Sequence, residues 1–341
     1  GKEVAIPIKE ENKMPIVVNT NASARAASFN LNKANNALQK SLARLSSGKR
    51  ITQPAEDAGG LAVAYKLDAT MKRTEAVLNN HQNALSYLQV QDGILDTMGS
   101  IVNRMAELKT MSMDVTKNTS DVENYSKEFR ELQTQLMQLR LEKFNGISLF
   151  SDSVSDTGTN SNSSSSFTFV DETNTSSSVT YRSHSRHLNT HPSGLDNDGS
   201  ISINVVNLQW MLGLDGTANS SFTNDNLAGL TANSNNSAGD GITGGIFTDI
   251  SDISIYQFTH VIEKVADARA ENGAEQARIT QSYELHQTNL VNLEAAHGRI
   301  MDADIAVEST RFAKNNVLVQ ASASMTAQAN QLTSIALTLL Q

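Results

Sequence analysis

NNVLVQASASMTAQANQLTSIALTLLQ, residues 315–341, is the stretch that decides the fold of this chain. It contains no Asp, Glu, Lys or Arg, yet its apolar residues alternate spacings of three and four in a ladder that only Gln328 interrupts. The apolar members of this ladder are Leu318, Ala321, Met325, Leu332, Ile335 and Leu339. This spacing predicts a helix with one apolar stripe. Because nothing else in the tail covers the stripe, we expect it to be buried against other helices or other copies of the chain.

The N-terminal part of the chain has the same character. Between residues 14 and 32 the only charged residue is Arg25. A helix is expected from about Ala22 to Ser46, where the sequence Ser-Ser-Gly interrupts the pattern. One side of this helix carries four leucines, which are Leu31, Leu38, Leu42 and Leu45. The stripes of the two chain ends most simply pack together, and we assign these leucines, the tail ladder and Ala329 to an assembly interface.

Composition excludes several classes of function. The chain of 341 residues has a net charge of −9 and no cysteine. The acidic balance argues against nucleic acid as a partner, and the lack of Cys excludes disulfides, thiolate metal sites and a Cys nucleophile. No run of 18 apolar residues predicts a membrane span, and the amides and hydroxyls of the tail would be costly in lipid. No cleavable secretory signal is expected either, so export would need another route.

Further ladders with helical spacing lie inside the chain. The first consists of Ala84, Tyr87, Gln91, Ile94, Met98, Ile101, Met105 and Leu108. The second consists of Val122, Tyr125, Phe129, Leu132, Leu136 and Leu139, and the third of Ile279, Tyr283, His286, Leu290, Leu293, His297 and Ile300. A capping-box pattern from Ser120 to Glu123 precedes the second ladder. Since only a short loop around Asn118 joins the first two ladders, they predict an antiparallel helical hairpin.

Between the helical parts, residues 151–249 are rich in Ser, Asn, Thr, Gly and Asp. Alternating runs at 167–170, 178–182 and 200–206 predict short strands, and Asn197-Asp198-Gly199 is typical of a hairpin turn. The predicted fold is therefore mainly α. Long antiparallel, coiled-coil-like helices come from both chain ends, and a small β-rich central insert lies at the tip.

Several motifs, taken in order, closely resemble bacterial flagellin. They are Val18-Asn19-Thr20-Asn21, SLARLSSGKRI at 41–51, EDAGGLAVA at 56–64, Phe144-Asn145-Gly146, RIMDADIA at 299–306 and Gln328-Ala329-Asn330-Gln331. The resemblance covers roughly residues 14–150 and 255–341. Several separate motifs in one order are far more specific than any single motif.

This resemblance implies a filament subunit with three parts. The terminal helices, residues 14–46 and 306–341, would form an inner-core domain. Residues 47–150 and 251–305 would form an outer-core domain, and 151–250 a variable β-rich surface domain. Residues 1–13 would be an N-terminal extension or a tag remnant.

The resemblance also implies how the protein works. It would polymerise into the extracellular flagellar filament for swimming, after export by the flagellar type III route without a cleaved signal. Its implied partners are copies of itself, an export chaperone, and cap and hook-junction proteins, with no cofactor, metal, nucleic acid or membrane. Two alternatives stay open, a hook–filament junction protein of the same architecture and a filament subunit whose central insert is an adhesin. No sequence motif supports an enzyme, because His-Glu-x-x-His, a Gly-rich phosphate loop and a nucleophile elbow are all missing.

Three groups of residues are candidate sites. Arg104, Glu107 and Leu108 match a stretch that a flagellin-sensing Toll-like receptor recognises, although Ala106 replaces an Arg; alternatively, Leu108 belongs to the ladder and the two charged residues are solvated. O-linked glycans are a possibility at Ser163, Ser164 and Ser165, with a plain soluble loop as the alternative. For the histidines at 184, 187 and 191, a solvated loop is favoured over a metal site.

Overall fold

The computed structural model describes residues 21–151, 161–170, 176–195, 198–214, 227, 247 and 249–338; side chains are described for all of these except 151, 161–170, 176–184, 209, 252 and 332–337. The predicted extension at 1–13 lies outside these residues. The chain divides into two compact units, Gly1–Ala69 with Asn292–Gln341, and Thr70–Val291. The two chain ends therefore belong to one unit, and the intervening sequence forms the other. The division into inner-core and outer-core domains stays a prediction.

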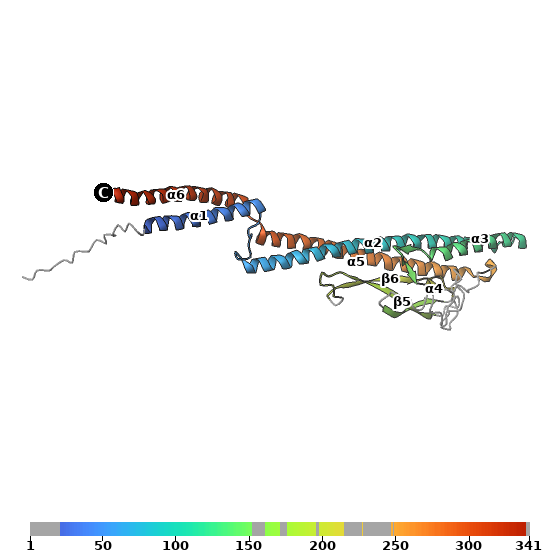
Figure 1. Ribbon diagram of the computed structural model, residues 1–341. Coiled ribbons are helices and arrows are strands. Elements are labelled where there is room, and N and C mark those ends of the chain that lie inside the picture. The colour runs from blue at the N-terminus through green and yellow to red at the C-terminus, as the bar shows by residue number, and fades with distance from the viewer. Residues whose placement is uncertain are drawn as a thin grey trace, which may run out of the picture. The chain divides into compact units, whose positions relative to one another are not determined.

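In the first unit, α1 (Ala22–Ser47) and α6 (Ile305–Thr338) lie side by side (Figure 1). The side chain of Asn21 accepts a hydrogen bond from the Ala24 N–H at 2.9 Å and caps the start of α1. The helix ends at Gly48, whose φ of 69° is a left-handed conformation that glycine adopts without strain. The helix predicted at the N-terminal end of the chain is therefore confirmed.

Two long helices, α2 (Ala58–Ser112) and α5 (Ile255–Met301), lie mostly in the second unit, where α3 (Thr119–Leu139) runs beside them (Figure 1). The ladder predicted from Ala84 to Leu108 is confirmed, since all its members are buried except Ile94, which is half-buried. A second stripe on α2 is also fully buried and consists of Leu88, Leu95 and Val102. Phe129 of α3 meets Phe258 of α5 edge to face, with 6.2 Å between ring centroids. These apolar contacts make the core of the unit.

The predicted capping box at Ser120 and Glu123 is wrong, because α3 begins two residues earlier. Asn118 is the N-cap, and its side chain accepts from the Asp121 N–H at 2.9 Å. The Asp121 carboxylate accepts from the Asn118 N–H at 3.2 Å. Asn is as good an N-cap as Ser, and Asp121 places a negative charge at the positive end of the helix dipole.

The insert contains a four-stranded sheet in the order β3-β6-β5-β4, formed by β3 (Phe150–Ser151), β4 (Ser161–Val170), β5 (Ser176–Asn189) and β6 (Ser200–Asn207). β4, β5 and β6 pair antiparallel, whereas β3 pairs parallel to β6. The buried side chains of Ile201, Ile203 and Val205 alternate with more exposed ones, as predicted. His184 and His187 lie in β5, so the expectation of a loop there was wrong; the strand pairing of β5 with two neighbours overrides its polar composition.

Three short elements complete the second unit. A hairpin of β1 (Lys143–Phe144) and β2 (Ile147–Ser148) turns at Asn145 and Gly146, which both have positive φ. α4 (Leu208–Met211) follows β6, and the 3-10 helix η1 (Ile250–Asp252) precedes α5. The predicted fold class, mainly α with a small β-rich insert, is confirmed. Within the described part of the chain, every helix is too short or too polar to cross a membrane.

Candidate assembly interface

α1 and α6 pack through stripes rich in small and polar side chains. Among the side chains of α6 that the structure describes, which exclude 332–337, the buried and half-buried ones are Glu308, Phe312, Asn315, Val319, Ser322, Thr326 and Ala329. The buried and half-buried residues of α1, which contacts α6, are Ala24, Ala27, Leu31, Ala34, Ala37, Leu38, Ser41, Arg44 and Leu45. Hydrogen bonds cross the pair near both ends of its described part: the Asn21 amide donates to the Ala329 carbonyl at 2.8 Å, and the Asn315 amide donates to Ser41 Oγ at 3.2 Å. Since the earlier residue of α1 pairs with the later residue of α6, these bonds show that the helices are antiparallel.

The apolar ladder predicted for the tail lies on another face of α6. Leu318 is 45% exposed, Met325 is 66% exposed and Ala321 is exposed as well. Ala329 is buried, so it belongs to the stripe that faces α1. The side chains of Leu332 and Ile335, and the whole of Leu339, lie outside the described residues. The described members of the tail ladder therefore do not pack on the N-terminal leucines, although the two helices do meet as expected.

The leucines of α1 differ in how far their side chains are buried. Leu31, Leu38 and Leu45 are half-buried, whereas Leu42 is 55% exposed. Other large apolar side chains are also exposed on α1 and α6, namely Phe29, Ile305, Val307 and Val317. Apolar side chains gathered in this density on the outside of a helix pair are typical of an interaction surface.

A joint of backbone hydrogen bonds lies at the other end of the helix pair. The Ala303 N–H donates to the Gly48 carbonyl at 2.9 Å, and the Arg50 N–H donates to the Met301 carbonyl at 2.6 Å. Lys49 and Asp302 pair in an isolated antiparallel bridge. Below them, Ile51, Ala64 and Met301 form a small buried cluster. The turn that follows α1 is thereby tied to the turn that precedes α6.

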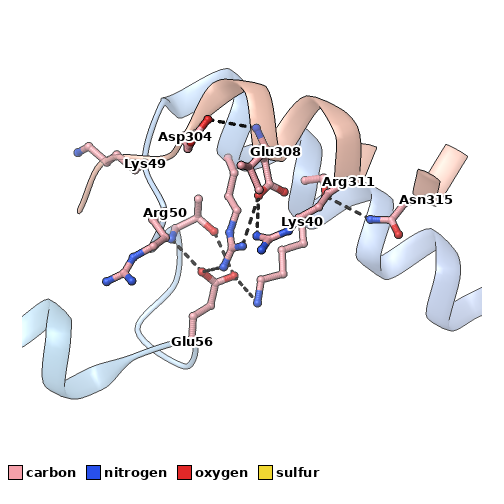
Figure 2. A network of polar contacts seen from close by, with 12 residues as sticks. Lys40, Lys49, Arg50, Glu56, Asp304, Glu308, Arg311 and Asn315 are labelled. Carbon is pink, nitrogen blue, oxygen red and sulfur yellow. Dashed lines mark hydrogen bonds and ion pairs between the residues drawn. The ribbon is translucent and has the colours of Figure 1, made fainter. Parts of the chain in front are cut away.

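A network of charged side chains covers this joint. Figure 2 shows Lys40 of α1 and Glu56 of the following turn close together, with Glu308 and Arg311 of α6 beside them. Lys40 Nζ lies 2.9 Å from Glu56 Oε1. Arg44 bridges the two acids, at 3.3 Å from Glu56 Oε2 and 3.7 Å from Glu308 Oε2. Arg311 adds a second contact to Glu308 at 3.3 Å.

Glu56 is held ionised by this network. Burial alone would raise the pKa of Glu56, but hydrogen bonds from Lys40, the Thr52 N–H and Arg44, together with the charge of Arg44, outweigh burial and lower the pKa to about 2. The apolar ladders did not predict this network. Its one signal in the sequence is the pair Lys40 and Arg44, which lie four residues apart on a helix.

The predicted receptor-recognition residues do not all lie at the surface. The side chains of Arg104 and Glu107 are exposed and contact each other at 3.1 Å, and Arg104 also contacts Glu128 at 2.8 Å. Leu108 is fully buried in the core of the second unit. Thus two of the three side chains are available to another protein.

The other candidate sites are only partly visible. Ser163, Ser164 and Ser165 lie in β4, and their side chains lie outside the described residues. His191 lies 4.0 Å from Asp198 in the turn between β5 and β6. Within the described residues, His, Asp and Glu side chains form no group of three or more that is able to hold a metal ion.

Comparison with known proteins relates the helical parts to one family. Residues 18–155 match the bacterial flagellin N-terminal helical region, and residues 255–340 match the bacterial flagellin C-terminal helical region. Flagellin A of Vibrio anguillarum is 27% identical over 380 residues, covering 96% of this chain and 100% of that protein. Flagellin of Bacillus subtilis is 28% identical over 322 residues, covering 92% and 96%. The flagellar filament 41 kDa core protein of Borreliella burgdorferi is 25% identical over 340 residues, covering 96% and 100%.

Proposed function

This chain belongs to the bacterial flagellin family, and we propose that it polymerises through the outward-facing apolar residues of α1 and α6. It is a structural subunit of the flagellar filament, which lies outside the cell, and it associates with copies of itself. The proposal concerns which surface makes that association.

The observation that supports it is the contrast between two faces of α6. The face against α1 carries Asn315, Ser322 and Thr326, whereas Leu318 and Met325 point elsewhere and remain exposed. Full burial of a Leu or Met side chain is worth about 1.5–3 kcal/mol. Scaled by their exposed fractions of 45% and 66%, the two residues would together gain about 2–3 kcal/mol per subunit when copies cover them. Repeated along a polymer, this gain favours assembly.

Charged substitutions on α6 test the proposal. Leu318→Asp and Met325→Asp should each prevent filament growth, because a charge buried between copies without a partner is strongly destabilising. Gln320→Asp is the matched control, since Gln320 is exposed on the same helix but lies outside the ladder. Electron microscopy and sedimentation would measure assembly, and circular dichroism would show that each monomer stays helical. Normal filaments from Met325→Asp, or equal loss of assembly in Gln320→Asp, would refute the assignment of this face.

We further infer that the protein leaves the cell by the flagellar type III route without a cleaved signal, and that an export chaperone, the cap and the hook-junction proteins are its partners. Family membership supports this inference. The flagellin family is structural, and we expect no catalytic activity. Secretion assays in cells with and without a working flagellar export gate would test the route; secretion that continues without the gate would contradict it.

Of the three residues that match the receptor-recognised stretch, we infer that Arg104 and Glu107 are the ones able to contact a Toll-like receptor. Their exposure supports this inference, and so does the burial of Leu108. The proposal that Ser163, Ser164 and Ser165 carry O-linked glycans remains a prediction, which intact-mass measurement of protein from the native organism would test.

A further inference from the structure

At Asn204, helices rather than a neighbouring strand cover one edge of β6. β5 pairs with the other edge, where Ser185 lies opposite Asn204. β3 pairs with β6 only at Val206 and Asn207, beyond this point. The Asn204 N–H instead donates to Glu275 Oε1 of α5 at 2.8 Å, and its carbonyl accepts from Gln91 of α2 at 3.4 Å. Side chains of two helices thus take the place of a further strand.

Two more contacts join β6 to the same face of α5. The Asn204 side-chain amide donates to Glu271 Oε2 at 2.7 Å, and Arg278 donates to the Ser200 carbonyl at 3.5 Å. Glu271, Glu275 and Arg278 are spaced by four and three residues, so they share one face of the helix. We call these three side chains the β6 clamp.

Glu275 is the member of the β6 clamp whose ionised form is disfavoured by burial. Its second oxygen, Oε2, is buried and has no hydrogen-bond partner within the described residues. Burial raises the pKa of Glu275 to about 7; the nearby Glu271 raises it further, while the Asn204 N–H and Arg278 oppose the rise. The carboxyl group therefore takes up or releases its proton near neutral pH.

The elements packed around Glu275 offer it little compensating charge. On β5, Arg186 lies beside Ser185 but directs its guanidinium to the Ser148 carbonyl. On α2, the residue that reaches Asn204 is the uncharged Gln91, and Asp92 is paired with Arg269 of α5. Within α5, the charged groups that act on Glu275 are Glu271 and Arg278, one of each sign.

We propose that the β6 clamp holds the sheet β3-β6-β5-β4 to α5 while Glu275 is protonated. When the medium becomes alkaline and Glu275 loses its proton, this attachment loosens. The sign follows from the raised pKa. In the folded chain the pKa of Glu275 is about 7 and lies above its ordinary value of 4.5. The contribution of Glu275 to the attachment of β6 is therefore complete below pH 4.5 and is lost as pH rises through about 7. The β6 clamp lies in the unit Thr70–Val291, whereas the assembly face lies in the other unit, so this inference is independent of the proposed assembly surface.

Hydrogen–deuterium exchange of the full-length monomer tests the attachment. Exchange times at pH 6 and pH 8 would be scaled for the intrinsic exchange rate, and peptides covering β6 would be compared with peptides covering 98–108 in the core. For the wild-type chain we expect opening of β6 to increase about tenfold from pH 6 to pH 8, with much less change in 98–108. In Glu275→Gln, whose amide oxygen is still able to accept from Asn204, the increase should disappear.

The matched control is Glu284→Gln, because Glu284 is exposed on the same helix and in the same unit. It should behave like the wild-type chain. An unchanged β6 protection between pH 6 and pH 8 in the wild-type chain would overturn the proposal. An equal rise in the 98–108 peptides would overturn it too, since that result describes general unfolding. Both readouts come from the wild-type chain, so they decide the matter even if Glu275→Gln fails to fold.

Discussion

Replacing Glu56 by Gln tests how much the charged network stabilises the joint between α1 and α6. The difference between the pKa of about 2 in the folded chain and the ordinary 4.5 corresponds to about 3 kcal/mol if fully realised. The Glu56 side chain is only 11% exposed, but Lys40 is 47% exposed, so solvent screens that pair. We therefore expect Glu56→Gln to destabilise the unit that contains the chain ends by about 1–2 kcal/mol at pH 7.

The effect should depend on pH in one direction. Because the folded pKa of Glu56 is depressed, its contribution is fully present above pH 4.5 and is lost as pH falls through about 2, so the difference between wild type and Glu56→Gln should fall to roughly half by pH 3 and vanish only below pH 2. Urea unfolding followed by far-UV circular dichroism reports both units, whereas the single tryptophan, Trp210, reports the unit Thr70–Val291. Glu56→Gln should shift the dichroism transition and leave the fluorescence transition in place. A difference between wild type and variant that is as large at pH 3 as at pH 7, or equal shifts of both signals, would refute the reasoning.

Two further predictions concern the second unit and can be checked by thermal denaturation. Asn118→Ala should lower the free energy of unfolding by about 1 kcal/mol because it removes the N-cap of α3, whereas Ser120→Ala should cause no measurable change. A larger loss of stability in Ser120→Ala than in Asn118→Ala would instead support Ser120 as the N-cap. Leu108→Ala should cost about 2–5 kcal/mol because Leu108 is fully buried, while Leu141→Ala, at an exposed position, should cost little. Comparable losses in these two variants would contradict the placement of Leu108 in the core.

The ladder from Ala84 to Leu108 could be predicted because its apolar positions are also its buried positions. The helices that cover it, α3 and α5, belong to the same chain and the same unit. Spacing, composition and packing then agree, and the sequence pattern is sufficient to identify the core. The strands of the insert were located by the same logic, although β5 proved longer than its apolar run.

α6 is the opposite case. Its most apolar ladder, with Leu318 and Met325, stays exposed, and the stripe that meets α1 includes Asn315, Ser322 and Thr326. Periodicity identifies the face with the highest apolar content, but it does not say whether the partner that covers this face belongs to the same chain. In a subunit that polymerises, helices of the same chain and helices of other copies compete to cover the same helix. The stripe that meets α1 mixes its polar side chains with apolar ones such as Phe312 and Val319, so apolar content alone does not distinguish it from the exposed ladder.

The polar contacts were beyond prediction for a related reason. Arg44 and Glu308, or Asn204 and Glu275, are each compatible with a solvated surface, and only the folded chain brings them together. Their placement has a consequence for how pH acts on the subunit. Residues 315–341 carry no ionisable side chain, so the outward ladder itself cannot respond to protons. Glu56 and Glu275 do respond, the first in acid and the second near neutral pH, and both lie in contacts within one subunit. Acid should therefore weaken a filament of this protein through the contacts between Glu56 and the residues around it, and not through the apolar surface that we propose the copies share.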